Sequence, residues 1–205
     1  MAEKMDECEL LEEMALERQV AFLAARSPDD WHRYAEMYNW DMRLEPLYWI
    51  ISQPECDRAT ATMLFWKGEP TGYDWWECEE KLGDSSYAVE PLLQHIAYRF
   101  NAGSYTRAEI AYDCVQAGGG GMNAEYDEMI RKGRLGDFEV LVEQQGDCDP
   151  AVRVHHDLLV LNFPGRKVGG FADNDQFYDL LPSEEDITND EVEAEAARRG
   201  VTLLR

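Results

Sequence analysis

All six tryptophans of this 205-residue chain lie between Trp31 and Trp76, and this clustering limits the possible folds more than any other feature. Tryptophan has a large apolar ring system that folded proteins tend to bury, so six in one stretch indicate that the stretch builds the core. Apolar residues there also recur with the spacing of one helix face, at Trp31, Tyr34, Ala35 and Tyr38. We therefore predict a helical, tryptophan-rich core.

Capping residues predict three helices within this stretch. The first runs from Ser27, a suitable N-cap, to Asn39, which can adopt the left-handed conformation that ends a helix. The second enters near Pro46, because proline is tolerated in a first turn. The third begins with Asp57 as its N-cap and ends at Gly68. Short helices joined by tight turns are therefore expected here.

Three more helices are predicted outside this stretch, two after it and one before it. An apolar stripe over residues 89–100 predicts a longer helix that Gly103 ends. Thr106 and Glu109 form a capping-box pattern, which predicts that another helix begins there. Residues 3–25 also show helical spacing, and we expect this opening helix to pack on the tryptophan-rich unit.

The last part of the chain has a different character. Residues 152–163 combine an alternating segment with a continuous apolar run, and the turn pair 164–165 follows, which predicts a β-hairpin or small sheet. A second capping box at Thr188 predicts a helix that Gly200 ends. Residues 201–204 are expected to form a last strand or a packed tail.

The glycine run at residues 118–121 is the best internal boundary, because it lacks the residues that would make it a phosphate-binding loop. We therefore predict a helical, tryptophan-rich domain over residues 1–117 and a smaller α+β part over residues 122–205. The predicted fold class is mainly α, with short amphipathic helices around the core and a small β-hairpin or sheet in the C-terminal third, which is α+β overall.

Charge restricts the partners of this chain. It carries 42 acidic and 19 basic residues, which gives a net charge of −23 and a pI near 4.4. Such a surface repels phosphate groups, so we expect it to bind neither nucleic acid nor an anionic membrane. It would attract a basic protein, although acidity that serves solubility alone explains the composition equally well.

The sequence also indicates where the protein works. It has no apolar run long enough for a signal peptide or a membrane span. Its five cysteines are odd in number, widely spaced and never form Cys-x-x-Cys, which argues against a disulfide framework and a zinc site. We expect a cytoplasmic protein with reduced thiols and without a metal or other cofactor, and the sequence does not indicate its oligomeric state.

Candidate acid–base and metal-binding residues each have a simpler structural explanation. Asp41 and Asp57 could act as paired carboxylates, yet both stand where helices are predicted to begin, so we interpret them as N-caps. Capping alone predicts that asparagine would replace either residue with little loss of stability. The His-His-Asp segment 155–157 would place its two imidazoles on opposite faces of a strand, and residues 173–175 lack the further ligands that a calcium loop needs.

A series of motifs follows the first predicted helix: Tyr38-Asn39-Trp40-Asp41, then Leu44 to Ile51, then Pro54 to Ala61 with its Cys-Asp pair, then Phe65-Trp66. This series, continued over residues 92–112, resembles a family of uncharacterised bacterial domains, with a family-like part over residues 27–113. The acid and glycine that usually follow the motif's aspartate are Met42 and Arg43 here. The family has no established activity, and its members resemble small accessory proteins found near bacterial toxins, which implies an immunity or protein-interaction role.

The absence of a catalytic motif favours an interaction protein over an enzyme, although the sequence does not decide between them. We expect an acidic module that binds and neutralises a basic bacterial toxin, with binding residues at Trp40, Asp41, Trp75, Trp76, Glu77, Glu79 and Glu80. Two alternatives stay open. One is a hydrolase-like enzyme that uses a carboxylate cluster near Asp41, Asp57 and Asp74, and the other is a structural domain of unassigned partner.

Overall fold

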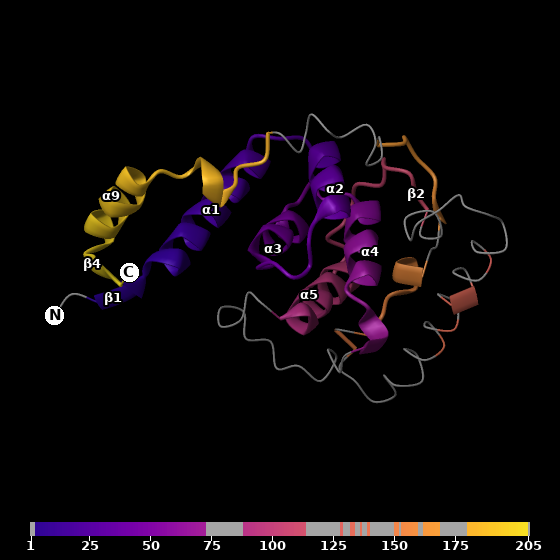
Figure 1. The fold of residues 1–205 in the computed structure, drawn as a ribbon. Helices are drawn as coiled ribbons and strands as arrows, with labels where there is room; N and C mark the ends of the chain where they lie inside the picture. Colours follow the sequence, from indigo (N-terminus) through magenta and orange to yellow (C-terminus); the bar gives the residue numbers. More distant parts are fainter. Residues whose placement is uncertain are drawn as a thin grey trace. The chain divides into compact units, whose positions relative to one another are not determined.

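The computed structural model describes residues 3–72, 88–113 and 180–204 and parts of the chain between them: residues 128, 132–133, 136, 139, 150–151, 153–159 and 162–168. The chain divides into two compact units, and the colours of Figure 1, which follow the sequence, show which segments form each unit. Unit 1 consists of Met1–Ser27 and Ala172–Arg205, and unit 2 is Pro28–Phe171. The fold is mainly helical with short strands, which confirms the predicted class.

Unit 2 contains four helices among its described residues: α2 (Pro28–Met37), α3 (Glu45–Ser52), α4 (Arg58–Lys67) and α5 (Val89–Asn101). Short 3-10 helices lie at Pro70–Gly72 (η1) and His156–Leu159 (η3). A two-stranded antiparallel sheet joins β2 (Tyr112–Asp113) to β3 (Asn162–Phe163), with Tyr112 opposite Phe163. The predicted small sheet is therefore present, but each of its strands pairs across a long stretch of sequence.

Helix α4 is the centre of unit 2. Every residue from Ala59 to Trp66 is buried, because α4 packs against α2, α3, α5 and β2. A helix that is enclosed on all sides must be apolar or neutral around its whole circumference, as this one is.

The predicted helix boundaries around α4 are largely confirmed. Helix α2 begins at Pro28, α3 carries Pro46 in its first turn, and Asp57 is the N-cap of α4. Asn39 does not take the left-handed conformation, since Glu69 is the one non-glycine residue with a positive φ in the described part of the chain. The Asn39 side chain instead accepts a hydrogen bond from the Asp41 amide at 3.0 Å, which forms a turn after α2.

The helix predicted at Thr106–Glu109 is absent. Residues 106–111 are extended, and the Arg58 amide donates to the Arg107 carbonyl oxygen at 2.9 Å. The Ala111 amide donates to the Arg166 carbonyl oxygen at 2.9 Å, so the segment is held on two sides. A Cβ at Gly165 would lie 2.5 Å from the Glu109 carbonyl oxygen, so only glycine allows this close approach. Long-range pairing has overridden the local capping pattern.

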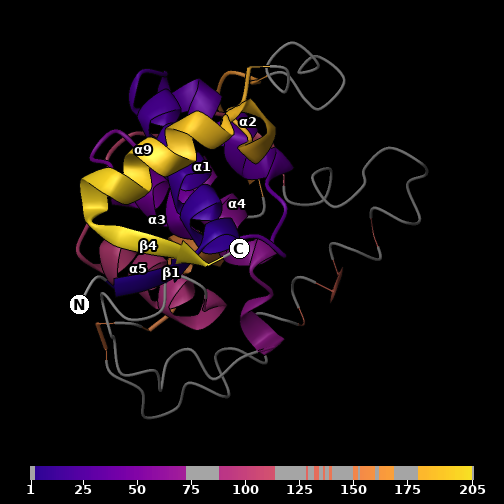
Figure 2. The same ribbon diagram turned by 60° about the vertical axis from the view of Figure 1, so that its left-hand side comes forward.

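Unit 1 is formed by the two ends of the chain. Its elements are β1 (Glu3–Asp6), α1 (Glu7–Ala24), η5 (Glu184–Asp186), α9 (Asn189–Arg199) and β4 (Val201–Leu204). Helix α9 lies along α1, and β1 and β4 run side by side as a parallel pair (Figure 2). The core of the unit is apolar and comprises Leu10, Met14, Ala15, Ile187, Val192 and Ala196.

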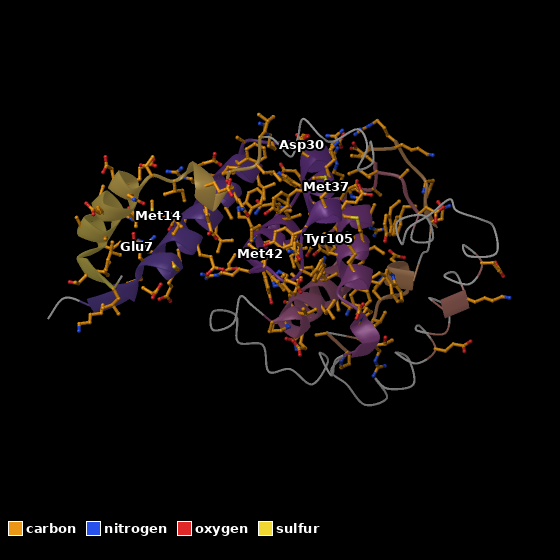
Figure 3. All side chains as sticks on the ribbon, viewed as in Figure 1. Glu7, Met14, Asp30, Met37, Met42 and Tyr105 are labelled. Carbon is orange, nitrogen blue, oxygen red and sulfur yellow. The ribbon has the colours of Figure 1, made fainter. Side chains whose placement is uncertain are left out.

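One prediction for unit 1 needs correction. The opening helix begins at Glu7 rather than at residue 3, because the residues before it form β1 and Asp6 caps the helix by accepting from the Cys8 amide at 2.8 Å. Sequence analysis missed the pairing of β1 with β4, because the paired residues lie at opposite ends of the chain. Within unit 1 the helix shares an apolar core with α9, and Figure 3 shows Met14 on the face of α1 toward α9. The expected packing of this helix on the tryptophan-rich unit stays a prediction.

Other predictions for unit 1 are confirmed. Thr188 and Glu191 form a reciprocal capping box at the start of α9. Gly200 has a φ of 71° after the last turn, a conformation that a residue with a side chain rarely adopts. Residues 201–204 form β4.

The compact units do not coincide with the predicted domains 1–117 and 122–205. The glycine run at 118–121 lies outside the described residues, so its role as a linker stays a prediction. None of the helices in the described ranges has the length and apolar character needed to cross a membrane.

Trp66 tests the assignment of the core. Its side chain is 1% exposed, and its Nε1–H donates to the Leu158 carbonyl oxygen at 2.7 Å. Trp66→Ala should lower the free energy of unfolding by roughly 3 to 5 kcal/mol, because it opens a large cavity. Trp66→Phe keeps the apolar ring but leaves the Leu158 carbonyl unpaired, and should cost about 1 to 3 kcal/mol.

Denaturant unfolding measures both changes. Tyr98→Ala on the exposed side of α5 is the matched control and should change stability by less than about 0.5 kcal/mol. A loss below about 1 kcal/mol for Trp66→Ala would mean that α4 is not the centre of the core.

Candidate functional site

A pocket of about 470 Å³ lies between α2, β2 and β3 in unit 2. Its volume falls within the range of small-molecule sites. Its polar and aromatic lining comes from segments far apart in sequence: His32, Glu36, Tyr112, Asp113, Asn162, Phe163 and Lys167. Sequence analysis did not find this pocket, because the pairing of β2 with β3 creates it.

His32 is the most buried polar residue of the pocket. It is 5% exposed, and its Nδ1 lies 2.9 Å from the Thr60 hydroxyl oxygen. Thr60 is 1% exposed and has no other hydrogen-bond partner among the described residues, so its hydroxyl hydrogen must point to Nδ1 to be satisfied. With Nδ1 accepting this bond, a neutral imidazole carries its hydrogen on Nε2.

Burial keeps His32 neutral. Removal of the imidazole from water lowers its pKa from 6.5 to about 4, and the nearby Arg33 and Lys67 lower it further, while Asp29 opposes them. The ring also meets Tyr112 edge to face, with the ring centres 6.3 Å apart. His32 is thus a fixed hydrogen-bond donor at ordinary pH.

Glu36 adds a carboxylate one helical turn from His32. Burial raises the pKa of Glu36, although the ammonium group of Lys67 opposes this shift. Lys67 donates a hydrogen bond to the Glu36 backbone oxygen, and burial lowers the pKa of Lys67. The pocket therefore combines a neutral N–H donor with carboxylates and can hold a small polar guest by hydrogen bonds.

Metal binding has no support in the part of the chain that the structure describes. No group of three or more His, Cys, Asp or Glu residues there could hold a metal ion. Residues 156–159 form the 3-10 helix η3 rather than part of the predicted strand, and the His155 Nδ1 accepts from the Asp157 amide at 3.1 Å. Residues 173–175 lie outside the described residues.

The Asp57 side chain binds both the first turn of α4 and a segment about 50 residues later in the chain. Its Oδ1 accepts from the Ala59 amide at 2.9 Å, and its Oδ2 accepts from the amides of Glu109 and Ile110 at 2.7 and 3.2 Å. The Arg107 guanidinium lies 3.7 Å from Oδ2, and the Asp57 side chain is fully buried. The predicted N-cap role is confirmed, and the same carboxylate also binds the extended segment after α5.

Asp41 behaves differently. It is exposed, and the residue before α3 is Leu44, which makes no side-chain cap. The predicted capping role of Asp41 is therefore wrong, because α3 begins at Glu45, four residues later. Since Asp57 is buried and Asp41 is on the surface, the two carboxylates do not share one solvent-accessible site. Trp40 is partly buried, and its Nε1 has no partner among the described residues.

The remaining predicted site residues lie in segment 73–87, which is outside the described part of the chain. The binding role of Trp75, Trp76, Glu77, Glu79 and Glu80 stays a prediction, as does the role of Asp74 in the hydrolase-like alternative.

Unit 1 carries a dense negative charge. It contains 17 acidic and six basic residues. Three of its arginines bind carboxylates within the unit: Arg18 pairs with Glu191, Arg198 with Glu195, and Arg199 with Glu13, Glu17 and Glu195. Hydrogen bonds from the Thr188 backbone, Arg18 and the Thr188 hydroxyl lower the pKa of Glu191 to about 2. Glu9, Glu184, Glu185 and Asp190 remain exposed.

Comparison with known proteins finds a match for part of the chain. Residues 26–100 match the model of a domain of unknown function (DUF4274), which is consistent with the predicted resemblance to an uncharacterised family. The match covers α2 to α5 and ends before β2. No curated protein and no solved structure matches the chain.

The geometry of Asp57 revises the expected effect of asparagine. Asp57→Asn would place an amide N–H₂ against the backbone N–H groups of Glu109 and Ile110, so both of those hydrogen bonds would be lost. We expect a loss of about 2 to 3 kcal/mol, because the acceptor is charged and buried. Asp57→Ala should cost at least as much. Denaturant unfolding provides the measurement.

Asp41→Asn is the control, since Asp41 is exposed and should change stability by less than about 0.5 kcal/mol. If Asp57→Asn were as stable as this control, the hydrogen bonds to the Glu109 and Ile110 amides would contribute nothing to stability, and only the cap bond from the Ala59 amide would contribute.

His32 predicts a pH dependence of stability. Between pH 6.5 and about 4 the unfolded chain binds a proton at His32 that the folded chain does not, so stability falls as pH decreases through this window. Between pH 7 and pH 5 the contribution is about 2 kcal/mol. His32→Asn should remove this part of the slope, while His95, whose pKa burial also lowers, acts equally in both proteins. Parallel pH profiles for the two proteins would contradict a neutral, buried His32.

Proposed function

We propose that this protein is an acidic protein-interaction module that binds a basic protein partner. The observation that carries the proposal is the negative charge of unit 1. Most of its arginines form ion pairs within the unit, while other carboxylates are exposed. A basic partner would meet a field that the module's own cations do not neutralise. Such a field increases the rate of encounter more than it strengthens the final complex.

The finer proposal is an immunity role, in which the partner is a basic bacterial toxin that the module neutralises in the cytoplasm. It rests on the resemblance of residues 27–113 to accessory proteins found near toxins and on the net charge of −23. The predicted binding residues stay candidate anchors for this partner: Trp40, Asp41, Trp75, Trp76, Glu77, Glu79 and Glu80. Asp57 is not a candidate, because both of its carboxylate oxygens already bind backbone amides.

This engagement of Asp57 also weakens the hydrolase-like alternative. A catalytic carboxylate must reach its substrate, and Asp57 has no exposed side-chain surface. The pocket at His32 offers a different possibility, the binding of a small polar ligand, because the His32 and Glu36 side chains line the same space. This second candidate would be tested by ligand-induced shifts in the His32 side-chain resonances.

Salt dependence tests the main proposal. The immobilised protein is incubated at low salt with a lysate of its own organism, and a captured basic protein is identified and purified. The association rate of that protein should fall steeply as salt rises to physiological strength, whereas its dissociation rate should change little. Capture of no basic protein, or an association rate that ignores salt, would overturn the proposal.

Two matched triple variants locate the surface. Glu184→Gln, Glu185→Gln and Asp190→Asn neutralise exposed acids of unit 1, whereas Glu55→Gln, Glu69→Gln and Glu139→Gln neutralise three exposed acids of unit 2. Each set changes the net charge by the same amount. The unit 1 set should slow association several-fold more than the unit 2 set. Equal effects would assign the attraction to net charge without a preferred surface.

A further inference from the structure

The β1–β4 sheet of unit 1 is incomplete as an isolated structure. Its two parallel strands pair Glu3 with Val201 and Asp6 with Leu204, and no third strand pairs with either in the described part of the chain. Parallel strands occur almost entirely within larger, covered sheets, and a two-stranded sheet is marginal alone. Both outer edges therefore present backbone N–H and C=O groups that a further strand could bind.

The two faces of this sheet also differ. Met5, Val201 and Leu203 pack on the core of unit 1, which fixes the sheet to α1 and α9. Lys4, Thr202 and Leu204 are exposed, and Leu204 shows 46% of its surface. The sheet thus packs on the core of unit 1 from one side, while no described residue pairs with its outer edges and its other face is exposed.

We propose that an extended basic segment of the partner adds a third strand to the β1–β4 sheet. This inference rests on the proposed function and names the mode by which the basic partner binds. Backbone hydrogen bonds along the edge would supply affinity, and alternate side chains would supply specificity.

Charge selects the occupant of the edge. A second copy of the chain would bring another net charge of −23 to a unit that is itself strongly acidic, so self-pairing is repelled. A strand with lysine or arginine at alternate positions would instead meet the acids beside β1, which include Asp6 and Glu9. Apolar residues at the intervening positions would lie on the opposite face of the added strand.

Peptides with blocked amides test strand addition directly. The probe is an octapeptide of alternating lysine and valine with capped ends, together with two isomers that are N-methylated either at every lysine or at every valine. In an edge strand, alternate amides point toward the sheet and the others toward solvent. One isomer should therefore lose binding by about tenfold or more, while the other should bind within about twofold of the parent.

Amide hydrogen exchange on the complex provides the second measurement. The parent peptide should slow exchange in residues 3–6 or 201–204, and the weaker isomer should not. Equal binding of both isomers at low salt would overturn strand addition while leaving the electrostatic proposal intact. No peptide binding, or a dimer in sedimentation experiments that excludes the peptide, would also overturn this inference, whereas the proposed function itself fails only if the lysate experiment yields no basic partner.

Discussion

The rest of unit 2 depends on the carboxylate of Asp57, which joins the start of α4 to the extended segment after α5. Three backbone N–H groups converge on its two oxygens, one from the first turn of α4 and two from the extended segment after α5. A buried carboxylate is costly unless it is fully hydrogen-bonded, so this arrangement requires both segments to be in place at once. Once the segment after α5 is fixed, β2 can follow it and pair with β3. The pocket at His32 therefore depends indirectly on Asp57.

The features that could be predicted from sequence are those that neighbouring residues decide. The capping box at Thr188, the N-cap at Asp57 and the end of α9 at Gly200 each involve groups within a few residues, and all three are confirmed. Clustered tryptophans also indicated the core correctly, since Trp31 and Trp66 are buried. Local hydrogen bonding and apolar spacing thus defined most helices before any tertiary contact was known.

The predictions that were wrong concern segments whose structure depends on contacts between residues far apart in sequence. Thr106 and Glu109 match a capping box, yet the Glu109 amide that a helix would use is bound by Asp57, 52 positions earlier. Residues 3–6 continue a helical pattern, yet they pair with the other end of the chain. His32 looked like an ordinary helix residue, and only the long-range pairing of β2 with β3 gives it a pocket. Tertiary hydrogen bonds of this kind outweigh local preferences of a fraction of a kcal/mol.

The two units use their charged groups in opposite ways. In unit 2, Asp57 and Asp29 are occupied by internal partners, so these acids support the fold. In unit 1 a larger fraction of the arginines than of the carboxylates takes part in the internal ion pairs that the structure describes. This follows because the unit has 17 acidic and six basic residues. Exposed ion pairs contribute little to stability, so the excess carboxylates are not needed to hold α1 against α9. The stability of the fold therefore does not explain the exposed acids of unit 1, and they are consistent with the proposed role in recognition.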